Sequence, residues 1–140
     1  MRKTFLHGIT AGILAAVAGI IYFNIYQHAL GTEFNKIINA GSITGASVFG
    51  CLLMALSYWL LEKFKKEKLK GVLNILIAVL SFASIIGVIS MNLPLDIKSP
   101  ELFPGLAVPM HFFPALAFFC MVPFFSTSPA QPLTAGPLAD

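Results

Sequence analysis

Two histidines and two amides are the side chains of this sequence best suited to bind a ligand. Asn24, Gln27 and His28 end the first apolar run, and Asn24 and His28 share a helical face at the i, i+4 spacing. His111 lies in the run 104–120, which otherwise holds mainly Leu, Ala, Val, Met, Phe and three prolines. Imidazole can hydrogen-bond, transfer protons or coordinate a metal. Polar groups within such apolar runs are costly and often functional.

Three uses of these side chains stay open. In the first, the neutral imidazole of His111 hydrogen-bonds Asn24 and holds two helices together. In the second, Asn24, His28 and His111 line a ligand pocket or an ion path. In the third, the two histidines hold a haem. Two histidines are too few for a closed zinc site without carboxylates, so we expect no metal and no cofactor.

The elements that must position these side chains are membrane-spanning helices. Of 140 residues, 57% are hydrophobic and 11% charged, whereas a soluble domain is about a quarter charged. Four uncharged runs reach the ~20 residues that a helix needs to cross ~30 Å of hydrocarbon. Without water, the backbone must be hydrogen-bonded within each segment. We predict an all-α, four-helix transmembrane bundle over 1–125, then a disordered cytoplasmic tail over 126–140. The predicted spans are 6–28, 41–61, 71–91 and 105–125.

The basic residues predict the orientation of the spans. Arg2 and Lys3 precede the first span, and five lysines lie between the second and third. Lys36 and Lys98 are alone in the other two loops, so the balance is seven to two. By the positive-inside rule, both termini and the second loop are cytoplasmic, in the cell (inner/plasma) membrane. We expect His7 to reach the headgroups at this end. The five lysines, which would also attract anionic lipid, are Lys63, Lys65, Lys66, Lys68 and Lys70.

Small residues at four-residue intervals predict close helix packing. Gly8, Gly12 and Ala16 form one such stripe in the first span, and Ala83 and Gly87 another in the third. We expect these stripes to pack the bundle itself; the alternative is that a stripe of the first or second span forms a face for a second copy of the chain. The first run also resembles a signal peptide, but its apolar character continues well past any cleavage point, so we expect a retained helix.

Prolines predict where the fourth span begins and bends. Pro104 and Pro109 each fit the first turn of a helix, where the missing N–H costs nothing. Pro114 and Pro123 lie further inside the span and cannot donate to the carbonyls four residues earlier. We therefore expect kinks at both.

Four segments follow one another in a familiar order: GITAGILAAVAGIIYF, ASVFGCLLMALSYWLLEKF, NILIAVLSFASIIGVISM and PMHFFPALAFFCMVPFF. This order resembles a family of small bacterial four-helix membrane proteins of unknown function. The resemblance matches Ser81 or Ser84 to a serine of the third helix, and Met110 and His111 to a Met-His pair that opens the fourth. Such proteins often have Gly-Pro where this chain has Gly-Val at 87–88. The resemblance implies a bacterial membrane location and four helices, but no activity.

The sequence favours a protein that is not an enzyme. It has no phosphate-binding glycine loop and no nucleophile with a base, and Cys51 and Cys120 lie in apolar runs, where a thiol behaves as a small apolar group. Two classes remain: a non-catalytic accessory or interaction component, or a small transporter or ligand-binding protein with an outer-side pocket of Asn24, His28 and His111. We favour the first. The expected partners are the lipid bilayer and another membrane protein or a second copy, and no nucleic acid.

Overall fold

The computed structural model describes residues 2–94 and 97–125, and these residues form helices and connecting turns without a strand. The prediction of an all-α, four-helix fold is confirmed, whereas the predicted tail, 126–140, lies outside the described residues. In chain order the elements are α1 (Arg2–Leu30), α2 (Ala40–Lys63), the short 3₁₀ helix η1 (Glu67–Leu69), α3 (Lys70–Ile89), a second 3₁₀ helix η2 (Pro100–Leu102), α4 (Phe103–Met110) and α5 (Phe113–Phe125).

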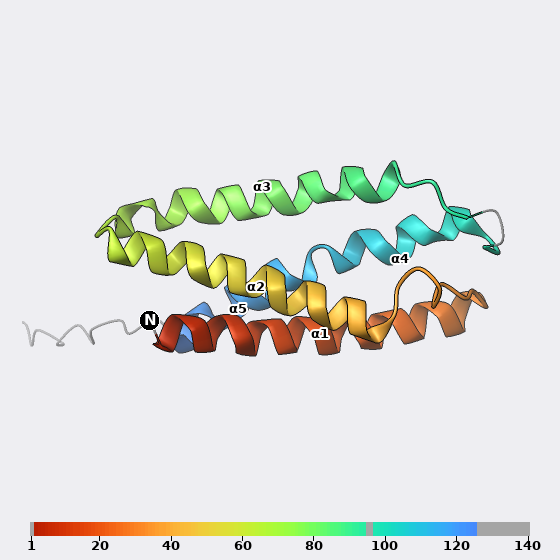
Figure 1. The fold of residues 1–140 in the computed structure, drawn as a ribbon, viewed down its shortest axis with the longest axis horizontal. Helices are drawn as coiled ribbons and strands as arrows, with labels where there is room; N and C mark the ends of the chain where they lie inside the picture. Colours follow the sequence, from red (N-terminus) through yellow and green to blue (C-terminus); the bar gives the residue numbers. More distant parts are fainter. Residues whose placement is uncertain (1, 95–96, 126–140) are drawn as a thin grey trace, which may run out of the picture.

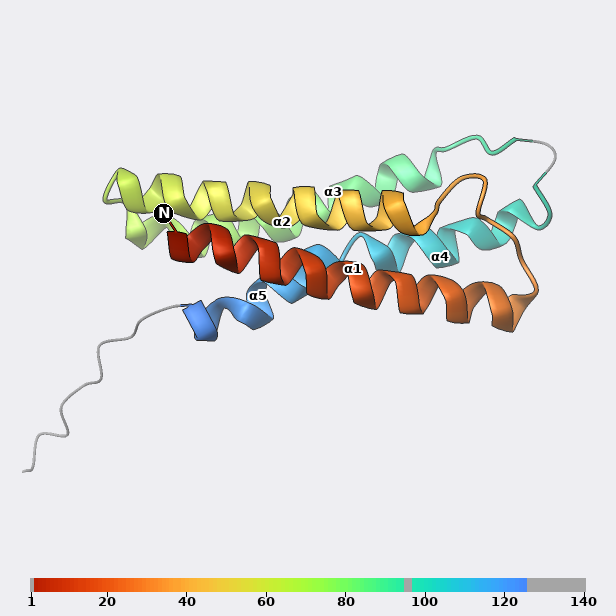
Figure 2. The same ribbon diagram turned by 60° about the horizontal axis from the view of Figure 1, so that its bottom comes forward.

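Among the described residues, four helical segments are long and apolar enough to cross a membrane: Arg2–Leu30, Ala40–Lys63, Glu67–Ile89 and Pro100–Phe125. Successive segments run in opposite directions along the long axis of the bundle (Figures 1 and 2). The N-terminus therefore lies at the same end as the lysine-rich turn between α2 and α3. The loops 31–39 and 90–99 lie at the opposite end, which we call the outer end, a name for a part of the bundle and not for a side of the membrane.

The contact between α1 and α2 depends on glycines. A Cβ added at Gly8 would lie 2.7 Å from the Cβ of Ala55, and one at Gly12 would lie 2.8 Å from the Cα of Val48. Both distances are too short for real carbon atoms, so only glycine allows the two backbones to approach this closely. The first-span stripe thus packs inside the bundle, as one of the two predicted uses requires.

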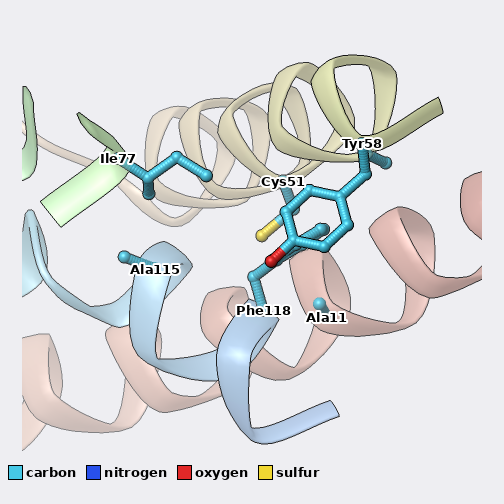
Figure 3. Packing of buried hydrophobic residues seen from close by; sticks show 7 residues of the cluster. Ala11, Cys51, Tyr58, Ile77, Ala115 and Phe118 are labelled. Atoms are coloured by element: carbon cyan, nitrogen blue, oxygen red, sulfur yellow. The ribbon is translucent and has the colours of Figure 1, made fainter. Parts of the chain in front are cut away.

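Buried side chains form two clusters along the bundle. The inner cluster joins all four spans, and Figure 3 shows the Tyr58 and Phe118 rings meeting beside the Cys51 thiol. The outer cluster is built around Phe34 and Leu106, neither of which is exposed. Loop residues complete it, among them Ile37, Ile38 and Ile97, so both loops pack against the helices at this end.

The fourth span is broken rather than merely kinked. Its first helix, α4, begins at Phe103 with Pro104 in the first turn, as predicted, but stops at Met110. Pro114 lies in the first turn of α5 and has no N–H to donate to α4. In the gap, the N–H groups of His111 and Phe112 donate to carbonyls only three residues earlier, at 3.2 and 3.1 Å.

The two halves of the fourth span are each attached to α1 by hydrogen bonds. The hydroxyls of Tyr22 and Tyr26 donate to the carbonyls of Gly105 and Leu102, at 2.8 and 2.7 Å. The Nε2 atom of His7 donates to the carbonyl of Phe118 in α5, at 2.9 Å. Pro109 has no N–H to donate to the carbonyl of Gly105, so the Tyr22 hydroxyl supplies the donor that this carbonyl needs.

Candidate functional site

The four side chains predicted to bind a ligand do not form one site. Nδ2 of Asn24 donates to the carbonyl of Ile20, and Nδ1 of His111 donates to the carbonyl of Ala107, both at 2.8 Å. Each bond therefore runs to the carbonyl four residues earlier in the same helix. The predicted hydrogen bond between Asn24 and His111 is wrong, and both Asn24 and His28 are exposed.

Gln27 has a structural role at the end of α1. Its Oε1 accepts the N–H of Phe34 at 2.6 Å, and its backbone carbonyl accepts the N–H of Thr32 at 3.1 Å. Gly31 between them has a φ of +62°, the left-handed conformation that commonly ends a helix. Gln27 thus fixes the turn that inserts Phe34 into the outer cluster.

A cavity of about 350 Å³ lies where α1 and α2 meet the break between α4 and α5. Of the four predicted ligand-binding residues, His111 alone lines it. Its wall is otherwise largely apolar, with serines supplied by α2. The lining residues are Gly19, Ile37, Ile38, Ser42, Ile43, Ala46, Ser47, Ala107, Met110, His111, Phe113 and Pro114.

The break in the fourth span supplies much of this wall. His111 follows the last residue of α4, and its ring is fixed by the bond to Ala107. A carbonyl only accepts, so Nδ1 carries the proton and, in the neutral imidazole, Nε2 presents a lone pair. His111 can therefore accept a hydrogen bond, but the neutral ring has no second N–H to offer.

The two serines in the wall differ in their hydrogen bonding. Ser42 belongs to the capping box of α2: its Oγ accepts the N–H of Asn39 at 3.0 Å and donates to the carbonyl of Asn39 at 2.8 Å. Ser47, one turn further along α2, is only 6% exposed. Its hydroxyl makes no hydrogen bond to any residue that the structure describes, so it is the available hydroxyl in the wall.

His7 is a buried polar residue, and its prediction as a headgroup-facing side chain is wrong. It is 4% exposed and lies between two rings of α5, with centroid distances of 4.2 Å to Phe118 and 5.0 Å to Phe125. The spacing of small residues in the sequence indicates this burial. His7 precedes Ala11 and Ala15 at four-residue steps, and both of those residues are fully buried.

The lysines between α2 and α3 are partly engaged with neighbouring side chains. Nζ of Lys70 lies 3.2 Å from Oε1 of Glu62 and 3.9 Å from Oε2 of Glu67. Nζ of Lys63 lies 5.1 Å from the centre of the Trp59 ring, within the range of a cation–π contact. Within residues 2–94 and 97–125, no group of three or more His, Cys, Asp or Glu lies close enough to hold a metal.

The fold and the cavity define a class: a multi-pass helical membrane protein with a small apolar cavity at a helix break. Compared with protein-family models, with curated proteins and with solved structures, the chain matches none. The resemblance to a bacterial membrane family therefore stays a prediction.

Proposed function

We propose that this protein is a non-catalytic interaction component of a membrane, which binds a helix of another membrane protein along the outward face of α3. The exposure of α3 carries the proposal. In the most apolar 18-residue stretch of this span, only 6% is buried within the bundle, whereas the corresponding share in the other three spans is 28–39%. Ile77 is its one buried residue among those described.

The few contacts that α3 makes with the rest of the bundle come from its inward face. Asn74 accepts a hydrogen bond from the hydroxyl of Tyr58 in α2, and Ile77 joins the inner cluster. On an adjacent face, Leu76 and Leu80 are 51% and 59% exposed. With Ala83 they form one stripe at the spacing of helical neighbours. Lipid alone can cover these leucines, so they do not by themselves require a partner.

The small residues of this stripe favour a helix as the partner. Ala83 and Gly87 are exposed, and a Cβ added at Gly87 would meet nothing within 4 Å. A hollow of this kind lets two helix backbones approach closely, and van der Waals contact then drives association in lipid. The chain uses the same device internally, because α2 docks on α1 at Gly8 and Gly12.

The hydroxyl groups of the spans support a structural rather than a catalytic role. Most of them donate to a carbonyl of their own helix, as serines and threonines in membrane helices commonly do. A hydroxyl held in this way is not activated as a nucleophile. These residues are Thr10, Thr44, Ser57, Ser81, Ser84 and Ser90.

We further propose that the lysine-rich end faces the cytoplasm. Arg2 and Lys3 lie at the same end as the turn between α2 and α3, so the basic residues reinforce one another instead of competing. Lys36 and Lys98 lie at the outer end.

The test is affinity purification of the tagged full chain from its native membranes in mild detergent, with mass spectrometry of the copurifying proteins. We expect one membrane protein at near-stoichiometric yield, and its loss from the Gly87→Leu variant. Gly45→Leu is the matched control, because Gly45 also has open space around it but lies on α2. Recovery of no partner, or of the same partner with Gly87→Leu, contradicts the proposal. Recovery of a second copy alone replaces the proposed partner with self-association.

A further inference from the structure

Ser47 departs from the other hydroxyl-bearing residues inside the described spans. Ser57, further along α2, donates to the carbonyl of Leu53 at 2.9 Å. Thr44, one turn before Ser47, donates to the carbonyl of Ala40 at 2.8 Å. Ser47 is more buried than either, yet its hydroxyl has no partner among the described residues. Because Ser47 lines the cavity, its hydroxyl is free to hydrogen-bond a molecule that enters there.

The cavity brings this hydroxyl into the same wall as the imidazole of His111. Ser47 can both donate and accept, whereas neutral His111, with Nδ1 bonded to Ala107, can only accept through Nε2. A ligand that satisfies both residues must therefore carry a donor for the neutral imidazole of His111, and it can offer Ser47 either an acceptor or a donor. A hydroxyl group meets both requirements. A ketone, a quinone or an ether offers no donor to His111.

We propose that this cavity binds a small apolar alcohol or phenol, whose O–H donates to Nε2 of His111 and whose oxygen accepts from Ser47. The remaining wall suits the apolar body of such a molecule, since Ile37, Met110 and Phe113 offer no competing hydrogen bonds. The site is independent of the partner-binding face on α3, because none of its lining residues belongs to α3.

The size and depth of the cavity limit the ligand. At about 350 Å³ it is near the lower end of the ~300–1,000 Å³ typical of ligand pockets, so one or two rings would fill it. Ser47 is seven residues into α2, about 10 Å from the outer end of that helix at 1.5 Å per residue. The ligand is therefore a molecule that partitions into the bilayer rather than a water-soluble metabolite.

The test uses 1-naphthol as the probe and 1-methoxynaphthalene as its matched analogue without the O–H donor. Equilibrium dialysis against the full chain in nanodiscs measures binding, and empty nanodiscs correct for partition into lipid. We expect saturable binding of one 1-naphthol per chain and weaker binding of the ether. Loss of one hydrogen bond in Ser47→Ala should weaken 1-naphthol binding roughly three- to tenfold, and His111→Phe should weaken it similarly.

Ser57→Ala is the matched control. It removes a hydroxyl from the same helix, but Ser57 does not line the cavity and its hydroxyl already has a partner. Circular dichroism of each variant identifies any that fails to fold, and Ser47→Ala, which removes one oxygen atom, keeps the test valid if His111→Phe does not fold. Absence of saturable binding, equal binding of the two probes, or unchanged binding by Ser47→Ala overturns the proposal.

Discussion

The imidazole of His7 stacks on the ring of Phe118 and donates a hydrogen bond to the backbone carbonyl of the same residue, 111 positions further along the chain. The ring planes are 20° apart and the Nε2–oxygen distance is 2.9 Å. One side chain of α1 thereby fixes both the position and the rotation of α5. This pairing assigns His7 a role in holding the last span.

Substitution of His7 separates its two contributions. His7→Phe keeps a stacked ring and loses the hydrogen bond, so the free energy of unfolding should fall by ~0.6 kcal/mol, the average for intramembrane hydrogen bonds. His7→Ala also loses the stack and should cost a further ~0.5–1.5 kcal/mol. Unfolding in mixed micelles, titrated with a denaturing detergent, measures both. His28→Ala is the control, because His28 is exposed at the other end of α1. Equal stabilities for wild type and His7→Ala would show that this pairing does not form.

A double-mutant cycle tests the hydrogen bond between Tyr58 and Asn74, which joins α2 to α3. Tyr58→Phe and Asn74→Leu should be non-additive, with a coupling energy of ~0.6 kcal/mol and at most ~1.7 kcal/mol. The cycle for Asn24 and His111 should instead be additive, because each of these side chains bonds its own helix. Additivity for Tyr58 and Asn74 would mean that these two side chains do not meet. Coupling between Asn24 and His111 would mean that they bond each other and not their own helices.

The glycines of α1 and α2 should respond oppositely to larger side chains. Gly12→Val places atoms against the backbone of Val48, which can only move by separating the helices, and should cost ~1–3 kcal/mol as an overpacked contact. Gly45 has open space around it, so Gly45→Ala should be neutral or should stabilise α2 by up to about 1 kcal/mol through helix propensity. Thermal melts in detergent measure both changes. A stable Gly12→Val variant would rule out the close contact between α1 and α2.

The orientation of the spans can be checked with reporter fusions. A reporter placed after Lys68 should give a cytoplasmic signal, and one placed after Lys98 an external signal, because seven of the nine basic residues belong to the lysine-rich end. Replacing the lysines of the second loop with glutamine should weaken this preference. An external signal after Lys68 would invert the topology.

The length and apolar composition of the runs were sufficient to predict the fold. A span must satisfy its own backbone hydrogen bonds, and a helix does so within one segment. The partners of polar side chains were not predictable in this way. A polar residue in a helix always has a carbonyl of its own preceding turn within reach. Asn24 and His111 both bond such a carbonyl, although their types and level in the bundle favoured a bond between helices.

Two features of the candidate site, the break in the fourth span and the burial of Ser47, could not be predicted from the sequence for physical reasons. Pro114 predicts a missing backbone hydrogen bond and a kink, but whether the helix bends or breaks there depends on the neighbouring spans. The burial of Ser47 depends on the rotation of α2 against α1, which the glycine contacts determine. Sequence periodicity indicates which residues share a face, but not which neighbour that face meets.

The break at His111 and Phe112 divides the last span into two parts with separate attachments, and this division has a consequence for local opening. The tyrosine hydroxyls of α1 hold α4, and His7 holds α5. Removing both hydroxyls, with Tyr22→Phe and Tyr26→Phe, should therefore raise amide hydrogen exchange in α4 and leave α5 protected. A continuous helix would transmit the loss along its whole length, whereas here the outer half can detach while the inner half stays folded, so the two halves should behave as separate cooperative units.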